Sequence, residues 1–227
     1  SARSGNTVVT GLPLRAAIAD LATRREDAQG AAQARREAAE RRGVNPDVPT
    51  LLVTGGSLGA LHVNESMTGA ADALPEGAQV VHLTGRGKDE PVRAAVEAAG
   101  LSDRWHVIDY LTTMEDALAV ADLVVCRSGA GTVAEMEALG LPCMYVPLPI
   151  GNGEQRLNAS DHVAAGGAQL IDDKDFTADF VRRNVFPLLG STRLADMAAA
   201  SQSLGRAGAA RALADLALEQ VKEDGHE

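Results

Sequence analysis

From Thr50 onward, the sequence alternates between short runs of consecutive apolar residues and segments whose apolar residues recur at helical spacing. Runs that are apolar at successive positions suit strands covered on both faces, and helices between them imply right-handed crossovers in a parallel sheet. The pattern therefore predicts an α/β fold, a Rossmann-like, doubly wound parallel sheet. The six predicted strands lie at residues 50–55, 78–85, 105–110, 121–126, 142–147 and 168–172.

The composition narrows the class of ligand. The 227-residue chain is 45% hydrophobic but only 3% aromatic, so its core must be aliphatic. Its net charge of -10 argues against nucleic acid as a partner, because binding DNA or RNA needs a concentrated basic surface that displaces counterions. Any anionic ligand must therefore be held by a local arrangement of donors.

Neither of the two cysteines belongs to a metal-binding pattern. Cys126 and Cys143 lie in apolar runs and lack the paired Cys or His spacing that zinc requires. We expect both to be reduced core thiols of a cytosolic chain. No run approaches the ~18 apolar residues of a membrane span, and residues 1–20 contain no signal-peptide pattern.

The two ends of the chain differ from its middle. Residues 16–43 are rich in alanine and in charge, which predicts a solvated helix or helix pair that Gly30 interrupts. The tail from Thr177 predicts two or three helices and then a polar, frayed end. Because the opening has no initiator Met and soon enters a strand-like run, we expect a piece of a longer protein.

The turns that follow the predicted strands are the expected ligand site, because open parallel α/β sheets bind ligands outside the carboxyl ends of their strands. Two of these turns are glycine-rich and open a helix: "GGSLGA" at 55–60 and "RSGAGTVAE" at 127–135. Such turns offer free N–H groups and a helix dipole to an anion, although glycine there often only permits tight packing. Two of them, with hydroxyls at Ser57, Ser128 and Thr132, favour a phosphate-bearing ligand.

Two common nucleotide motifs fit poorly. The phosphate loop of P-loop NTPases is absent, because "GRGKDE" has neither its spacing nor its hydroxyl. Gly129, Gly131 and Ala134 satisfy the dinucleotide fingerprint G-x-G-x-x-A. That fingerprint also needs an acidic residue at the end of the next strand, and none precedes Glu154. A dinucleotide site is therefore a poor explanation of the turn.

Glu135, just inside the helix after this turn, has two possible roles. It fits a capping box with Thr132, in which the glutamate reaches back to the cap N–H, or it could accept hydrogen bonds from a ribose diol. The residues alone favour the cap. No histidine suggests catalysis: His82 and His106 are expected in the core or at an edge, and His162 on the surface.

Five motifs in this order and spacing closely resemble the carboxyl-terminal half of the MurG family, the peptidoglycan N-acetylglucosaminyltransferases that convert lipid I to lipid II. They are "TGLPLR", "LLVTGGSLGA", "ADLVVCRSGAGTVAE", "GLPCMYVPLP" and "NGEQRLNA". The resemblance covers the chain from about Thr10, and its loops look most like those of actinobacterial members. It implies the second domain of a GT-B glycosyltransferase, which binds UDP-N-acetylglucosamine.

The resemblance also implies domain limits and site residues. Residues 1–12 would end an interdomain segment, residues 13–200 would form the UDP-sugar domain, and residues 201–227 would be a helix and frayed tail. Arg15 and Ser57 match family positions whose side chains suit pyrophosphate oxygens. Leu111 matches the position whose backbone binds the edge of uracil. Glu135 matches the glutamate that binds the ribose hydroxyls, and Gln155 matches a glutamine that hydrogen-bonds the sugar. The turn and helix start match at Ala130, Gly131, Thr132, Val133, Ala134 and Glu135.

The chemistry implied is an inverting transfer without metal or cofactor, in which arginine and helix dipoles stabilise the departing UDP. The fragment would hold the donor but transfer nothing. The preceding domain would supply lipid I binding and peripheral contact with the inner face of the bacterial cell membrane, as expected of an enzyme of cell wall synthesis, cell shape and cell division.

Four positions depart from the family pattern: Leu12, Leu58, Gly131 and Glu154. Leu12 and Leu58 remove polar groups near the cleft, and Glu154 adds a charge beside the sugar pocket, so the sugar is less firmly implied than UDP. Two alternatives remain. One is another UDP-sugar-using GT-B transferase or an epimerase, and the other is a non-catalytic nucleotide-binding module.

Overall fold

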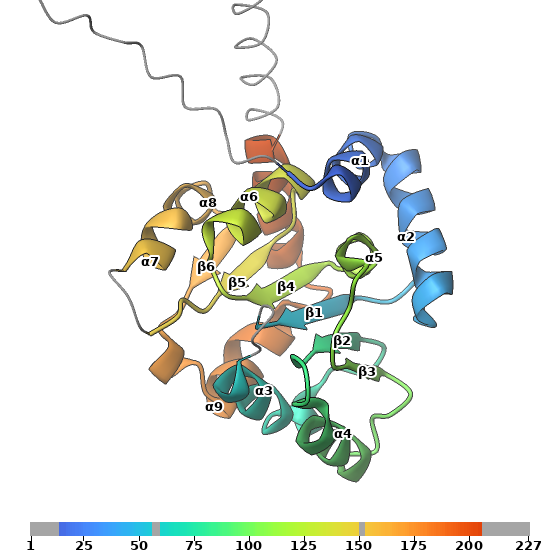
Figure 1. Ribbon diagram of the computed structural model, residues 1–227, viewed down its shortest axis with the longest axis vertical. Coiled ribbons are helices and arrows are strands. Elements are labelled where there is room, and N and C mark those ends of the chain that lie inside the picture. Colours follow the sequence, from blue (N-terminus) through green and yellow to red (C-terminus); the bar gives the residue numbers. More distant parts are fainter. Residues whose placement is uncertain (1–13, 56–59, 150–152, 206–227) are drawn as a thin grey trace, which may run out of the picture.

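The computed structural model describes residues 14–55, 60–149 and 153–205. Within these ranges, six parallel strands form one sheet in the order β3-β2-β1-β4-β5-β6 (Figure 1). Each predicted apolar run contains one strand, so the predicted doubly wound sheet is confirmed. The strands are β1 (Thr50–Thr54), β2 (Gln79–Leu83), β3 (Trp105–Ile108), β4 (Leu123–Cys126), β5 (Cys143–Tyr145) and β6 (Ala168–Leu170).

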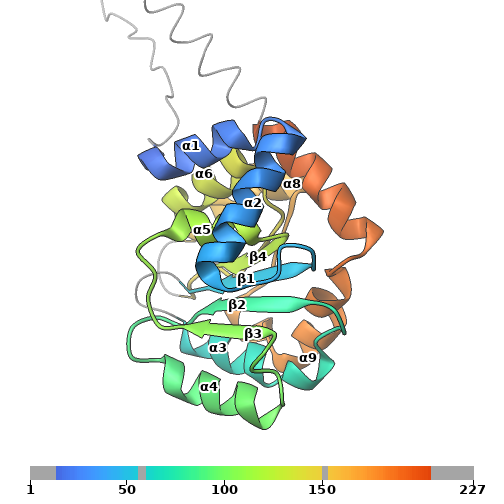
Figure 2. The same cartoon turned by 90° about the vertical axis from the view of Figure 1, so that its right-hand side faces the viewer.

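Helices cover both faces of the sheet, as Figure 2 shows. One face carries α1 (Ala16–Arg24), α2 (Ala28–Arg42), α5 (Met114–Val120), α6 (Ala130–Leu139) and α8 (Ser160–Ala164). Helix α7 (Glu154–Asn158) contacts α6 and α8. The other face carries α3 (Leu61–Thr68), α4 (Asp89–Ala98) and α9 (Ala178–Phe180), and Ala71 of η1 (Ala71–Ala73) is buried in the core on that side. The chain continues through η2 (Asp173–Asp175), η3 (Val181–Val185) and η4 (Phe186–Leu188) to a helix over residues 192–205.

The sheet separates two aliphatic cores. Successive strand residues point to opposite faces, so Leu51 and Val53 enter the core under α3 and α4, whereas Leu52 enters the core under α2 and α5. All five residues of β1 are buried. This matches the expectation from consecutive apolar residues. Cys126 and Cys143 are free and buried in the second core, as predicted.

The alanine-rich amino-terminal segment forms the predicted helix pair, but it is less solvated than expected. Ala34, Ala38 and Ala39 of α2 are buried, since their small side chains let the helix lie close to α5. Gly30 does not interrupt the helix: Asp27 caps α2 by accepting from the Gly30 N–H at 2.8 Å. A Cβ on Gly30 would lie 2.3 Å from the Arg24 carbonyl oxygen, so this glycine permits close approach of α1 and α2.

His162 was expected on the surface, and that expectation is wrong. Its side chain is fully buried between Tyr145 of β5 and Ser201 of the carboxyl-terminal helix. Its ring nitrogens lie 2.9 Å from the Tyr145 hydroxyl and 2.8 Å from the Ser201 hydroxyl. Ser201 donates onward to the Gly167 carbonyl, which leaves its oxygen to accept from His162 Nε2–H. The network joins β5, α8 and the last described helix.

Candidate functional site

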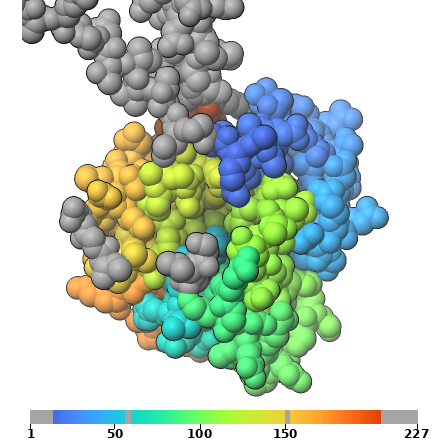
Figure 3. Space-filling view, viewed as in Figure 1, coloured from blue at the N-terminus to red at the C-terminus, as the bar shows by residue number. Residues whose placement is uncertain are grey.

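The candidate site lies at the carboxyl edge of the sheet, near the point between β1 and β4 where the strand order reverses. In open α/β sheets this switch point is where ligands bind. Figure 3 shows this side of the molecule, with atoms of α6 and of the segment after β3 near one another. The predicted site residue Ser57 lies outside the described residues, so its position stays a prediction. Leu12 and Leu58, two of the departures from the family pattern, lie outside them too.

Helix α6 begins earlier than the capping box predicted from the sequence would place it. Gly129 is the N-cap, with extended backbone angles of φ -63 and ψ 148, and no side chain caps the helix. Thr132 is therefore the third residue of the helix, where it cannot be the cap, so the capping box of Thr132 and Glu135 is wrong. The first N–H groups of α6, from Ala130 onward, have no partner within the helix and are available to an anion.

The glycines of this turn are not explained by packing. A Cβ built on Gly129 or on Gly131 would meet no described atom within 4 Å. No described residue therefore fills the space beside these two glycines. Of the two roles considered for the turn, this observation favours approach of a ligand to the backbone over close packing of the helix against the sheet.

Ser128, which precedes the cap, is fully buried, and its hydroxyl oxygen has no hydrogen-bond partner among the described residues. Leaving such a group unpaired costs about 1–3 kcal/mol. Asn158 of α7 donates from Nδ2 to the Ser128 carbonyl at 3.1 Å and so fixes the turn to the next helix. A fixed turn that carries an unpaired hydroxyl is consistent with a site built for a ligand.

Arg15 and Glu135 contact each other, although the sequence predicted that they bind different parts of the ligand, the pyrophosphate and the ribose. Arg15 donates from Nε to Glu135 Oε1 at 2.7 Å and from Nη2 to Oε2 at 2.8 Å. This hydrogen-bonded carboxylate raises the pKa of the Arg15 guanidinium. The Arg15 side chain is 55% exposed and that of Glu135 is 15% exposed. The pair joins the start of α1 to the middle of α6.

Leu111 lies in the segment between β3 and α5. The strand ends at Ile108, two residues before the predicted end at Tyr110. No described residue hydrogen-bonds to the backbone N–H or C=O of Leu111, so both are available to the edge of a base. Beside it, the Arg86 guanidinium lies 3.9 Å from the centre of the Tyr110 ring. Both residues are exposed at this edge of the sheet.

The amide oxygen of Gln155 in α7 accepts a hydrogen bond from the backbone N–H of Leu148 at 2.9 Å. Its amide nitrogen has no hydrogen-bond partner among the described residues, so a donor group remains for a ligand. The contact also fixes the position of α7 relative to the loop after β5. The predicted residues Ala130 to Glu135 and Gln155 thus follow neighbouring strands, β4 and β5.

Two residues that support this edge were not predicted. Arg127, directly after β4, donates to the carbonyls of Val146 and Pro147 at 3.0 and 3.1 Å and pairs with Asp173 at 2.5 Å. Asn158 is the other. Its spacing was a usable signal, because residues three apart share one face of a helix and Asn158 lies three after Gln155. Arg127 carried no comparable signal in the sequence.

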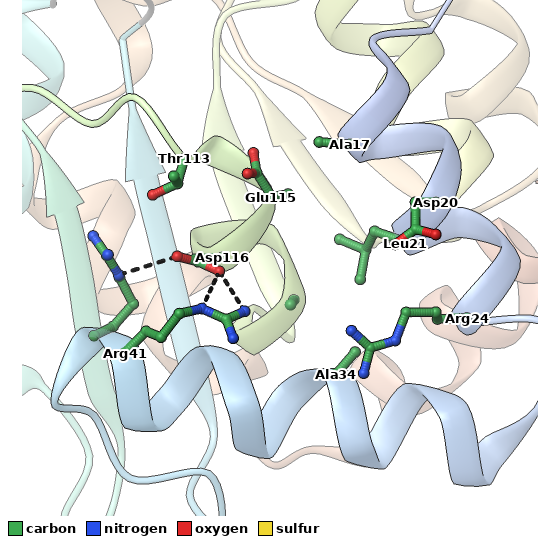
Figure 4. A pocket seen from close by; sticks show the side chains of 11 residues that line it. Ala17, Asp20, Leu21, Arg24, Ala34, Arg41, Thr113, Glu115 and Asp116 are labelled. Carbon is green, nitrogen blue, oxygen red and sulfur yellow. Dashed lines mark hydrogen bonds and ion pairs between the residues drawn. The ribbon is translucent and has the colours of Figure 1, made fainter.

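A cavity of about 350 Å³ lies apart from these residues, between α1, α2 and α5 (Figure 4). Asp116 is buried there, and it accepts from Arg41 Nη2 at 2.7 Å and lies 3.4 Å from Arg42 Nε. The lining holds three arginines and three acidic residues, so its charges balance and favour no ion. None of the predicted site residues lines it.

Two further findings concern metals and membranes. Among the described residues, no group of three or more His, Cys, Asp or Glu side chains gathers closely enough to hold a metal ion. Within the same ranges, no helix has the length and apolar character to cross a membrane.

The sheet order, the helices on both faces and the polar turns at the carboxyl edge define a Rossmann-like α/β domain. Residues 50–213 match the family described as "Glycosyltransferase family 28 C-terminal domain", and the chain belongs to that family.

Curated relatives agree with this assignment. The chain is 47% identical over 219 residues to the UDP-N-acetylglucosamine--N-acetylmuramyl-(pentapeptide) pyrophosphoryl-undecaprenol N-acetylglucosamine transferase of Bifidobacterium longum, covering 90% of this chain and 55% of that protein. It is 44% identical to the protein of the same name from Paenarthrobacter aurescens, covering 93% of this chain and 55% of that protein. The chain therefore spans about half the length of these relatives.

Among solved structures, MurG of Acinetobacter baumannii superposes with a TM-score of 0.63 at 28% identity, over 73% of this chain and 48% of that one. The architecture is thus that of the C-terminal domain of a GT-B glycosyltransferase, as predicted. The predicted resemblance to MurG, with actinobacterial relatives, is confirmed.

Proposed function

We propose that this chain is the donor-binding half of an inverting transferase. The whole protein would move N-acetylglucosamine from UDP-N-acetylglucosamine to lipid I and so form lipid II of peptidoglycan. The observation that carries the proposal is the helix end at Gly129 and Gly131, where no described residue fills the space beside the glycines, together with the Ser128 hydroxyl, which has no partner among the described residues. The names of relatives at 44 to 47% identity support the sugar and the acceptor.

Each part of the donor has a suitable group at the carboxyl edge. The N–H groups at the start of α6 suit the pyrophosphate, with Ser57 as a further donor. The free backbone groups of Leu111 suit the edge of uracil, which offers both donors and acceptors. Glu135 suits the ribose hydroxyls, and the free amide nitrogen of Gln155 suits an oxygen of the sugar.

The reaction follows from the charge that develops on the leaving group. The C4 hydroxyl of the muramoyl residue attacks the anomeric carbon, the bond to the pyrophosphate oxygen breaks, and UDP leaves with added negative charge. The helix end from Ala130 to Thr132 would stabilise that charge in the transition state. The base that takes the hydroxyl proton would come from the other half of the whole protein.

The remaining assignments complete the proposal. As predicted from the sequence, residues 13–200 would form the UDP-sugar domain, residues 1–12 would end an interdomain segment, and residues 201–227 would be a helix and tail; residues 1–13 and 206–227 lie outside the described residues. The described helix over residues 192–205 crosses the limit at residue 200, so its first part would belong to the domain. The whole protein would act at the inner face of the bacterial membrane, with lipid contact outside this chain.

The test is a comparison of two substitutions at Gly131, which is exposed in the first turn of α6. Gly131→Asp adds a carboxylate where the pyrophosphate would bind, whereas Gly131→Asn adds the same volume without the charge. Aspartate near a helix N-terminus stabilises the fold by about 0.3–1 kcal/mol, so lost binding cannot be attributed to unfolding.

Millimolar UDP should raise the melting temperature of the wild-type chain. At about 100 times Kd, binding stabilises by about 2.7 kcal/mol, which is about 5–11 °C for a domain of this size. The Asn variant should keep most of this shift and the Asp variant should lose it, while ADP should give little shift in any form. No shift of the wild type with UDP, or equal shifts in both variants, would contradict the proposal.

A donor panel then separates this function from another UDP-sugar-using transferase or an epimerase. UDP-N-acetylglucosamine should raise the melting temperature more than UDP-glucose or UDP-galactose at equal concentration. Equal shifts would indicate that only the UDP part is recognised, and would leave the N-acetylglucosamine assignment unsupported by this half of the protein.

A further inference from the structure

A chain of hydrogen bonds between three buried side chains runs from β3 through β2 to α3. The indole Nε1–H of Trp105 donates to His82 Nδ1 at 3.2 Å, and His82 Nε2 lies 3.0 Å from Asn64 Oδ1. The Asn64 amide nitrogen donates to the carbonyl of Thr84 at 3.0 Å. Trp105, His82 and Asn64 are each at most 3% exposed, so water does not replace these hydrogen bonds.

The indole fixes the direction of the whole network, because its nitrogen can only donate. His82 Nδ1 must therefore accept from Trp105, which places the single imidazole proton on Nε2. Burial lowers the pKa of His82 to about 3 and so keeps the ring neutral. The Nε2–H group then donates to Asn64 Oδ1, and the amide nitrogen of Asn64 is turned to Thr84. The Asn64 side chain thus has one satisfied orientation.

The network ends at the carboxyl edge of the sheet, beside the segment that carries Leu111. Thr84 directly follows β2, and its N–H donates to the carbonyl of Ile108 at 3.0 Å. Its hydroxyl donates to the same oxygen at 3.3 Å. Ile108 is the last residue of β3. Asn64, in the first turn of α3, thereby joins this helix to the ends of both strands.

We propose that Asn64 is a positioning residue for recognition of the base: it fixes the ends of β2 and β3, and with them the backbone of Leu111, without contacting the ligand. The inference rests on the proposed function and deepens it. Hydrogen bonds weaken steeply when their geometry is lost, so a shifted strand end would lose contacts to the edge of uracil. The phosphate contacts follow β4 instead, where no residue of this network lies.

The test measures the affinities of UDP and CDP for the whole 227-residue chain by titration calorimetry, because these two ligands differ only at the edge of the base. Wild type should prefer UDP. Asn64→Ala should weaken UDP binding about tenfold and lower the ratio of UDP to CDP affinity about threefold or more, because the Thr84 carbonyl loses its buried hydrogen bond.

The matched control is Gln79→Ala, which removes a buried amide from the opposite, amino end of β2. The Gln79 amide nitrogen donates to the Asn45 carbonyl at 2.6 Å and to the Thr50 hydroxyl at 2.8 Å. This variant should also lose stability in urea unfolding, but its UDP affinity should change by less than about twofold and its ratio of UDP to CDP affinity should not change.

A second variant, Trp105→Phe, removes the donor that fixes the network and keeps an aromatic ring in the core. It should weaken UDP binding about threefold in the wild-type background and by less than about twofold in the Asn64→Ala background, because it acts through Asn64. If Asn64→Ala does not fold, Trp105→Phe compared with Gln79→Ala decides between the same results.

Three results would overturn the inference alone. They are an unchanged ratio of UDP to CDP affinity in the foldable network variants, an equal fall of that ratio in Gln79→Ala, and equal wild-type affinities for the two ligands. If the wild-type chain does not bind UDP at all, the proposed function itself fails, and the inference fails with it.

Discussion

The buried network of Tyr145, His162 and Ser201 makes the stability of this domain sensitive to acid, and His162→Gln tests this sensitivity. Burial lowers the pKa of His162 from 6.5 to about 4. The folded protein therefore keeps the imidazole neutral, with Nδ1 accepting from the Tyr145 hydroxyl and Nε2–H donating to Ser201. In the unfolded chain the same ring takes up a proton below its ordinary pKa.

The sign and size of the effect follow from proton linkage. Between pH 6.5 and 4 the unfolded state binds more protons than the folded state, so the free energy of unfolding falls as the pH falls. With these two pKa values, His162 alone lowers the free energy of unfolding by about 2 kcal/mol between pH 7.5 and pH 5. Burial lowers the pKa of His82 to about 3, so His82 lowers the free energy of unfolding by a similar amount, and the His162→Gln variant keeps that contribution.

The measurement is urea unfolding at pH 7.5 and at pH 5, followed by the fluorescence of Trp105, the single tryptophan of the chain. His162→Gln should be less stable than wild type at pH 7.5, because the network loses its geometry. Between pH 7.5 and pH 5, the free energy of unfolding of the variant should fall by about 2 kcal/mol less than that of wild type. This difference corresponds to about 4–8 °C in melting temperature. Equal losses in the two proteins would refute a neutral, buried His162.

Two further predictions concern the neighbourhood of α6. Asn158→Ala should weaken UDP binding about threefold to tenfold, measured by calorimetry, with a small loss of stability, because the Ser128 carbonyl loses its hydrogen bond. Unchanged affinity would mean that the turn keeps its shape without this hydrogen bond. Gly140→Ala should lower the free energy of urea unfolding by more than about 2 kcal/mol, because φ is 62° and the new Cβ would lie 2.8 Å from Gln202 Cγ. The control Gly43→Ala, with φ of 66° and no described atom within 4 Å, should cost only about 1 kcal/mol, and equal costs would exclude the clash.

The strands and the general position of the site were predictable from the sequence because both depend on local patterns. Consecutive apolar residues in "TLLVT" are needed by a strand with a core on each face, and β1 is buried at every position. Glycine-rich turns after strands follow from the same topology, because carboxyl ends of parallel strands meet at one edge. The turn from Gly129 to Gly131 lies there as expected.

Other features depended on contacts that no local pattern reveals. His162 was expected on the surface because its neighbours are polar, yet Tyr145 and Ser201, 17 and 39 residues away, enclose it. The alanines of α2 belong to a strongly polar helix, but their small size brings them against α5 and buries them. A residue's neighbours in sequence do not determine which distant element covers it.

The parallel sheet, the aliphatic cores on its two faces and the edge at which polar turns gather were all predictable from local sequence patterns, because periodicity and turn residues act over a few positions. The start of α6 at Ala130, with Gly129 as its N-cap, and the contact of Glu135 with Arg15, 120 residues away, rather than with its own helix cap, depend on the folded chain. A cap and an ion pair compete for the same carboxylate. Which partner it takes depends on the packing of α1 against α6, and that packing is a property of the folded chain.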